Sequence, residues 1–191
     1  MNLTRYLALL FFGLVIVVLI VVLFFSNNSS QSNAQLNQKL NNFAAYSNTD
    51  SVASVDINGP INGQSIHNEA KISVSSSEVN LQVYQGYDGS VIKNETFPNS
   101  QNSYAAFLRA LYINGFDSTP KTNSVTSPVG ICSSGDTYSF SLTLGSTNIV
   151  NAWQTNCLND IYTYNGKLQY TLSLFEQQVP NYNSYIANLN F

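Results

Sequence analysis

The sequence predicts an α+β fold, in which an N-terminal transmembrane helix precedes an antiparallel β-sheet domain with two amphipathic helices on one face and one disulfide. Three observations support this prediction. Residues 6–25 form an unbroken apolar run, residues 137–144 alternate strictly between apolar and polar side chains, and residues 104–112 and 168–179 repeat apolar side chains at helical spacing.

The apolar run YLALLFFGLVIVVLIVVLFF contains no charged side chain, and as a helix it would be about 30 Å long, which matches the core of a lipid bilayer. Arg5 stands directly before it, and the first charge after it is Lys39. By the positive-inside rule, the N-terminus is expected in the cytoplasm and the rest of the chain outside the cell, with the bilayer as the partner of residues 6–25.

Two alternatives to this anchor remain open. The run could belong to a cleaved secretory signal, because small residues at Ser32-Asn33-Ala34 would suit a signal peptidase, although signal cores are usually shorter. It could also be a pilin-like stem that packs into a filament. No acidic residue occurs in the run after Gly13, where that family carries a glutamate.

The composition supports three regions: a membrane anchor at 1–25, a polar linker at 26–50, and an extracellular α+β domain at 51–191. Within the linker, Leu36, Leu40 and Phe43 lie on one helical stripe and predict a short helix. Charged residues are only 9% of the chain, with ten acidic against seven basic side chains. This weakly acidic balance argues against nucleic acid or anionic lipid headgroups as partners.

Four strands are predicted in the first half of the domain. Apolar and polar residues alternate at 52–57, 70–75 and 79–83, and the segment 90–97 is expected to return after a turn at 86–89. Asn-Gly pairs at 58–59 and 62–63 supply turn chemistry between the first two strands. Together these segments predict an antiparallel sheet with half-buried strands.

Two helices follow from the apolar stripes. The first covers 104–112, with Asn102 or Ser103 as the expected N-cap and Asn114-Gly115 as its end. An irregular connection is expected at 117–129. The second helix covers 167–179 and ends at Pro180, and the aromatic tail after it is expected to dock on the domain.

The clearest hairpin joins 137–144 to 148–155. If Leu144 pairs with Thr147, the sum of the paired residue numbers along the hairpin is close to that of Cys132 and Cys157. The two cysteines therefore meet at the open end of the hairpin. This geometry and the expected exterior location both predict a Cys132–Cys157 disulfide.

Several phrases of the domain resemble small single-pass envelope proteins of Saccharibacteria, the ultrasmall epibiotic bacteria: GYDGSVI, NSYAAFLRALYINGF, GICSSGDTYSF, WQTNC and LFEQQVPNY. The resemblance spans residues 50–186 and rests mainly on aromatic residues, glycines and cysteines. It implies an extracellular domain on a bacterial surface. It implies no reaction, and no functional residue is carried over.

Residue types that carry catalysis are scarce. His67 is the only histidine and is expected to be exposed, and no Gly-x-Ser-x-Gly turn is present. Asp88 and Glu95 could face each other across a hairpin as a carboxylate pair, but nothing around them supports glycoside chemistry. The sequence therefore predicts no catalytic residues, no metal ligands and no cofactor.

Tyrosine is the one feature that indicates binding. Tyr84, Tyr87, Tyr162 and Tyr164 fall in or beside predicted turns among Asn and Ser, a composition typical of adaptable binding surfaces. Packing at the edges of the domain is the alternative role for these residues. We therefore expect a noncatalytic cell-surface domain that binds protein or glycan, or has a structural role. The alternatives are a subunit of a filament or secretion apparatus, and an envelope enzyme or enzyme inhibitor.

Overall fold

The computed structural model describes residues 35–118, 127–157, 162–189 and 191. The predicted transmembrane helix at 6–25 lies outside these residues. Among the helices described, none is both long and apolar enough to cross a membrane. The chain divides into two compact units, 1–41 and 42–191. Of the first unit, residues 35–41 are described and are helical.

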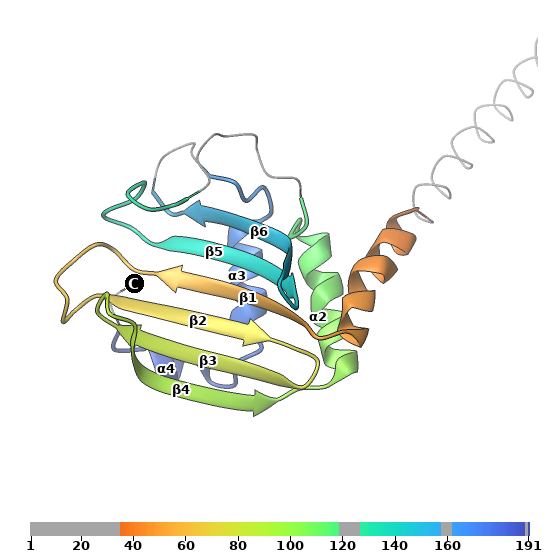
Figure 1. Cartoon of the computed structure of the whole chain (residues 1–191), viewed down its shortest axis with the longest axis horizontal. Coiled ribbons are helices and arrows are strands. Elements are labelled where there is room, and N and C mark those ends of the chain that lie inside the picture. Colours follow the sequence, from red (N-terminus) through yellow and green to blue (C-terminus); the bar gives the residue numbers. More distant parts are fainter. Residues whose placement is uncertain (1–34, 119–126, 158–161, 190) are drawn as a thin grey trace, which may run out of the picture. The chain divides into compact units, whose positions relative to one another are not determined.

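The second unit contains a six-stranded sheet in which every neighbouring pair is antiparallel (Figure 1). The spatial order is β4-β3-β2-β1-β5-β6. The strands are β1 (Ser51–Asn58), β2 (Asn68–Val74), β3 (Glu78–Gln85), β4 (Ser90–Pro98), β5 (Thr137–Leu144) and β6 (Thr147–Thr155). The predicted α+β class and the antiparallel sheet are therefore confirmed.

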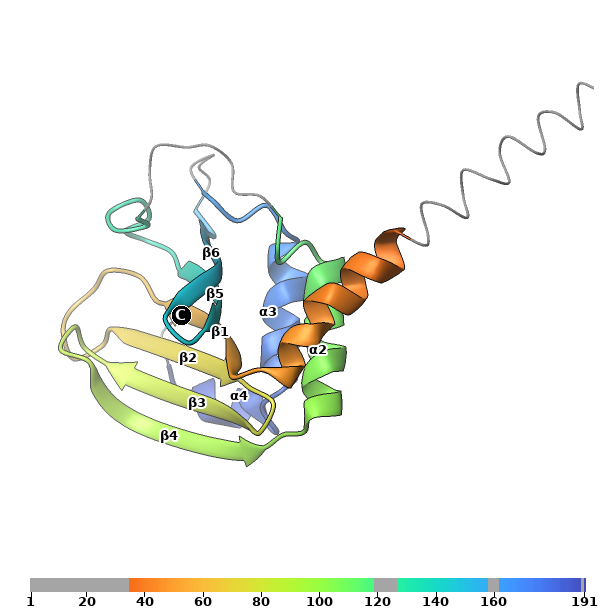
Figure 2. The ribbon, with the colours of Figure 1, turned by 45° about the vertical axis from the view of Figure 1, so that its right-hand side comes forward.

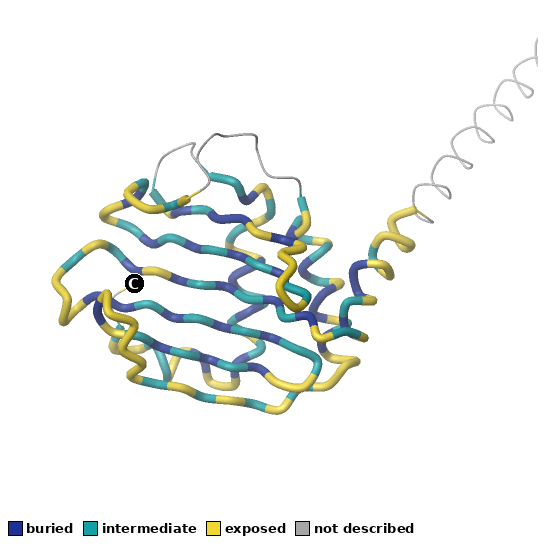
Figure 3. The backbone as a smooth tube through the Cα atoms, viewed as in Figure 1, coloured by how far each residue is buried: buried dark blue, intermediate teal, exposed yellow. Residues whose placement is uncertain are grey.

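Helices cover one face of this sheet (Figures 1 and 2). They are α2 (Gln101–Ile113), α3 (Leu168–Glu176) and the short α4 (Tyr182–Ile186). Along β1, β2 and β5, buried residues alternate with half-buried ones, as Figure 3 shows. The alternation follows from the period of two in a strand, which sends apolar side chains to the helices and polar side chains to the opposite, open face.

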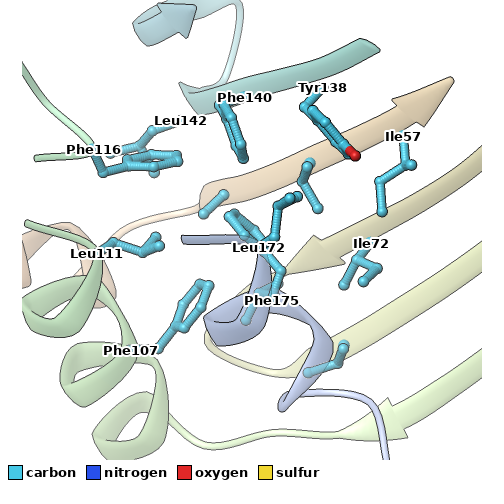
Figure 4. Packing of buried hydrophobic residues seen from close by; sticks show 14 of the residues in the cluster. Ile57, Ile72, Phe107, Leu111, Phe116, Tyr138, Phe140, Leu142, Leu172 and Phe175 are labelled. Atoms are coloured by element: carbon cyan, nitrogen blue, oxygen red, sulfur yellow. The ribbon is translucent and has the colours of Figure 1, made fainter. Parts of the chain in front are cut away.

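The core is an aromatic cluster between the sheet and the helices (Figure 4). Phe175 of α3 is fully buried, and its ring lies 5.1 Å from that of Phe107 and 6.0 Å from that of Phe116. The same ring lies 6.4 Å from Phe140 on β5. One side chain thus contacts α2, the segment after it, and the sheet, so it fixes how these three parts pack.

Residues 42–50 lead into the sheet. Residues 42–44 are helical and continue into the 3-10 helix η1 (Ala45–Asn48). The ring of Phe43 is buried and packs against Tyr112 and Phe116. Of the apolar stripe in the predicted short helix, Phe43 is thus the residue that joins the core, whereas Leu36 is half exposed.

The helix ends differ from the predicted ones. The N-cap of α2 is Ser100, whose side chain accepts a hydrogen bond from the backbone N–H of Ser103, so Asn102 and Ser103 lie inside the helix. The predicted end at Asn114-Gly115 is confirmed, with Gly115 at a φ of 83°. The tail after Pro180 does dock, as expected, but it does so as the helix α4, in which Tyr182 is buried.

Replacing Phe175 with alanine should lower the free energy of unfolding by about 4 kcal/mol, because it removes a ring buried against three parts of the fold. Urea unfolding followed by circular dichroism measures this change. Tyr170→Ala is the control, since Tyr170 lies on the same helix but is 68% exposed. A loss of similar size in both variants would contradict the assignment of the core to this face of α3.

Candidate functional site

The candidate site lies at one end of the sheet, which we call the loop end (left in Figure 1). Because all strands are antiparallel, β1, β3 and β6 end there, while β2, β4 and β5 begin there. The connections 59–67, 86–89 and 128–136 therefore gather at this end. Residue 51, where the chain enters the sheet, lies at the opposite end.

A stacked pair of rings organises the loop end. The rings of Tyr87 and His67 lie 4.1 Å apart with planes inclined by 14°. His67 is buried, and its Nδ1–H donates to the carbonyl oxygen of Pro60 at 3.1 Å. The Tyr87 hydroxyl accepts from the N–H of Asn62 and donates to its carbonyl oxygen, both at 2.9 Å. Tyr87 is thus held by its ring face and by its hydroxyl.

Further hydrogen bonds connect the loops to one another. The backbone N–H of Gly86 donates to the carbonyl of His67, which joins the β3–β4 turn to the β1–β2 loop. The N–H of Ile61 donates to the carbonyl of Ser133, which joins that loop to the segment before β5. The loop end is therefore tied together across segments that are distant in sequence.

The predicted disulfide is confirmed. Cys132 and Cys157 are bonded, with 5.8 Å between their Cα atoms, and they close the open end of the β5–β6 hairpin. The predicted pairing of Leu144 with Thr147 is also observed, and a register shift follows between Leu142 and Thr143. The disulfide therefore holds the segment 128–136 beside the end of β6.

A pocket of about 220 Å³ opens at the loop end on the open face of the sheet. Its floor consists of polar side chains from the strand ends, Asn58 of β1 and Thr137 and Ser139 of β5. The rest of the lining comes from the loops: Gly59, Ile61, Tyr87, Pro128, Val129, Gly130 and Cys132. None of the ten lining residues is charged. We call this the loop-end pocket.

The polar side chains of the pocket floor are not paired with each other. Some polar side chains elsewhere on the open face bond to each other, as Ser54 does to Ser141 at 2.7 Å. In contrast, the side chains of Asn58, Thr137 and Ser139 form no hydrogen bond with any residue in the described ranges. Three donors and acceptors thus face the pocket with their hydrogen-bonding capacity available to a ligand.

Three ionisable residues, Lys71, Asp56 and Glu69, border the floor of the pocket. Lys71 pairs with Asp56 through Oδ2 at 3.3 Å, and Asp56 is opposite Ser139 in the sheet register. Glu69 is opposite Asn58. Partial burial, together with the hydrogen bond to Asp56 and its charge, raises the pKa of Glu69 to about 7. Below this pH, a protonated Glu69 can donate to Asp56 Oδ1, which is buried and has no other partner among the described residues.

The four tyrosines considered for a binding surface lie in different environments. Tyr87 lines the pocket and is 53% exposed, and Tyr84 lies half-buried on the open face, where its hydroxyl donates to Gln82. Tyr162 is half-buried in the segment after β6. Tyr164 is buried in the core, 4.4 Å from the ring of Phe140, which agrees with the alternative that it packs in the domain and not with a place on a binding surface.

Two other expectations are corrected. His67 is buried rather than exposed, because the β1–β2 loop folds its ring beneath Tyr87. Asp88 and Glu95 do not face each other, because Asp88 lies in the turn and accepts from the N–H of Ser90, whereas Glu95 is opposite Leu81 on β3. The candidate carboxylate pair is therefore not formed.

A larger hollow of about 470 Å³ lies over the turn between α3 and α4. A single local stretch, 176–184, supplies all the residues that line it. It brings together no side chains from distant segments, so the loop-end pocket is the better candidate site. Among the described residues, no cluster of three or more His, Cys, Asp or Glu side chains could hold a metal ion.

In comparisons with known proteins, no protein-family model matches this chain, and no curated protein matches it.

Reducing the Cys132–Cys157 bond should lower the free energy of unfolding by about 3 kcal/mol, because the bond closes a loop with a sequence separation of 25. Urea titrations with and without reductant measure the difference. The double variant Cys132→Ser, Cys157→Ser is the control and should not respond to reductant. Equal stability of the oxidised and reduced protein would contradict a structural role for the bond.

The stability of the domain should depend on the protonation of Glu69. Because folding raises the pKa of Glu69 from 4.5 to about 7, its stabilising contribution is complete below pH 4.5 and is lost as the pH rises through 7. Glu69→Gln mimics the protonated form, so it should match the natural protein at pH 4 and be more stable at pH 9. The expected difference at pH 9 is about 1 kcal/mol, because solvent screens this half-exposed side chain. Urea titrations at both pH values test this, and parallel pH profiles of the two proteins would refute it.

Proposed function

We propose that this chain is a single-pass membrane protein of a bacterial envelope whose extracellular domain binds a protein or glycan at the loop-end pocket, without catalysis. The apolar run at 6–25 supports the anchor, and Arg5 before it supports a cytoplasmic N-terminus. The Cys132–Cys157 bond supports an oxidising compartment, because such bonds persist mainly outside the cytosol.

The observation that carries the binding proposal is the polar floor of the loop-end pocket. Asn58 is exposed, and Thr137 and Ser139 are half-buried on the open face of the sheet. Here Asn58, Thr137 and Ser139 converge on one pocket without an internal partner among the described residues. Convergent polar groups beside an aromatic and aliphatic wall are the usual composition of a ligand site.

The position of the loop-end pocket also suits binding. The eight residues of β1 separate Ser51 from the pocket, a distance of about 24 Å at the rise of an extended strand. The pocket therefore lies a full strand length from the point where the chain arrives from the proposed anchor. A ligand can reach it without approaching that point.

The lining of the pocket favours binding over catalysis. Its side chains offer hydroxyl, amide, aliphatic and aromatic groups, and none of the ten residues is an acid, a histidine or a lysine. The nearby His67 uses Nδ1 to bond Pro60 and is covered by Tyr87. General acid or base chemistry requires a titratable group within reach of the ligand. Among the described lining residues this is Tyr87, whose hydroxyl is already bonded to both backbone groups of Asn62.

Liposomes that carry the full chain should adhere to immobilised bacterial envelopes, and Thr137→Arg should weaken adhesion at least about tenfold. The arginine would fill the pocket while leaving the covered face of β5 unchanged. Thr143→Arg is the matched control, because Thr143 lies on the same face of the same strand at its other end. Fluorescence of the retained liposomes measures adhesion.

Equal adhesion by both arginine variants would contradict a role for the loop-end pocket. Melting temperatures of the variants, followed by circular dichroism, show whether either change disturbs folding. Both positions are half-buried on the open face, so both variants should melt close to the natural protein.

A further inference from the structure

Tyr87 presents a flat apolar platform to the loop-end pocket. One face of its ring is stacked on His67, and yet the side chain is 53% exposed, so the opposite face is open to solvent. Its hydroxyl is already bonded to both backbone groups of Asn62. Tyr87 therefore offers a ligand its ring face, because its hydroxyl group is already occupied by Asn62.

The described side chains that line the pocket around the platform carry no charge. Lys71 pairs with Asp56 beside the floor. Asp88, which follows Tyr87 in the turn, accepts a hydrogen bond from Ser90. Glu69, which lies opposite Asn58 of the floor, is partly protonated near neutral pH because its pKa is raised to about 7. The pocket thus lacks the full charge that an anionic or cationic ligand would need.

From these features we infer that the ligand is a neutral saccharide, with one sugar ring lying on Tyr87 and its hydroxyl groups bonded to Asn58, Thr137 and Ser139. This inference rests on the proposed binding function. A sugar ring has an apolar face of C–H groups, which suits the electron-rich face of an aromatic ring. Its edge carries hydroxyl groups that both donate and accept, as the floor requires.

The size of the pocket agrees with this assignment. At about 220 Å³ it is smaller than the roughly 300 Å³ at which sites for drug-sized ligands begin. It is therefore suited to one ring rather than to an extended group. The polar open face next to it, with Ser54, Ser141 and Tyr84, could carry further sugar units of a longer chain.

An apolar peptide side chain fits the same walls but not the same floor. Ile61 and Val129 would accept it, but burying it over Asn58, Thr137 and Ser139 would leave their donors and acceptors without partners. Each polar group that is desolvated and left unpaired weakens binding. The neutral saccharide satisfies walls and floor together, so the observations favour it.

The first test measures binding of neutral hexoses and N-acetylhexosamines to the full chain by saturation-transfer NMR. A non-glycosidic detergent is needed, because sugar headgroups would compete for the pocket. At least one saccharide should bind, Tyr87→Ala should weaken it at least about tenfold, and Tyr170→Ala, at an exposed tyrosine on α3 away from the pocket, should keep the affinity within about twofold. Thr137→Val, which removes a hydroxyl at constant shape, should weaken binding about fivefold.

The second test separates this inference from the proposed function by treating the envelopes before liposome adhesion. Periodate, which cleaves sugar rings, should abolish adhesion, and protease should not. Adhesion that is lost with protease but resists periodate, with no saccharide bound, would overturn the saccharide inference and leave the binding function intact. Adhesion that is insensitive to Thr137→Arg would overturn both.

Discussion

Burial of one face of the sheet beneath α2 and α3 is the constraint on which the rest of this domain depends. Phe175 holds the helices to the strands by contacting Phe107, Phe116 and Phe140 at once. Since side chains alternate along a strand, this burial sends the polar residues of β1, β2 and β5 to the opposite face. Burial of one face of the sheet therefore makes the other face polar, and the loop-end pocket lies at the edge of that polar face.

The loops then convert the end of that face into a shaped site. His67 supports Tyr87 from below, Asn62 holds its hydroxyl, and the disulfide keeps the segment 128–136 beside β6. A site fixed before binding loses little conformational freedom when a ligand arrives, which favours affinity from a small contact area. The hydrogen bond from Ile61 to Ser133 joins the two sides of the pocket in the same way.

Local patterns predicted much of the fold. The period of two in residues 137–144, the Leu144–Thr147 pairing and the Cys132–Cys157 bond all follow from spacing within one hairpin. Contacts between distant segments could not be read in this way. The burial of Tyr164 depends on Phe140 and Thr171, and the burial of His67 depends on a turn twenty residues later. The sequence singled out Tyr87 for a possible binding surface, and Tyr87 lines the loop-end pocket. The sequence could not identify its polar neighbours Thr137 and Ser139, which look like ordinary strand residues.

A preformed site at the loop end is the central claim, and amide hydrogen exchange of the full chain tests it most directly. The N–H groups of Ile61, His67 and Gly86 donate to carbonyls of other loop-end residues. Their exchange should be slowed to within about tenfold of the β1–β2 ladder in the absence of any ligand. Exchange of these three amides at the rate of an unstructured chain, with the sheet still protected, would show that the loops are not held and would contradict the claim.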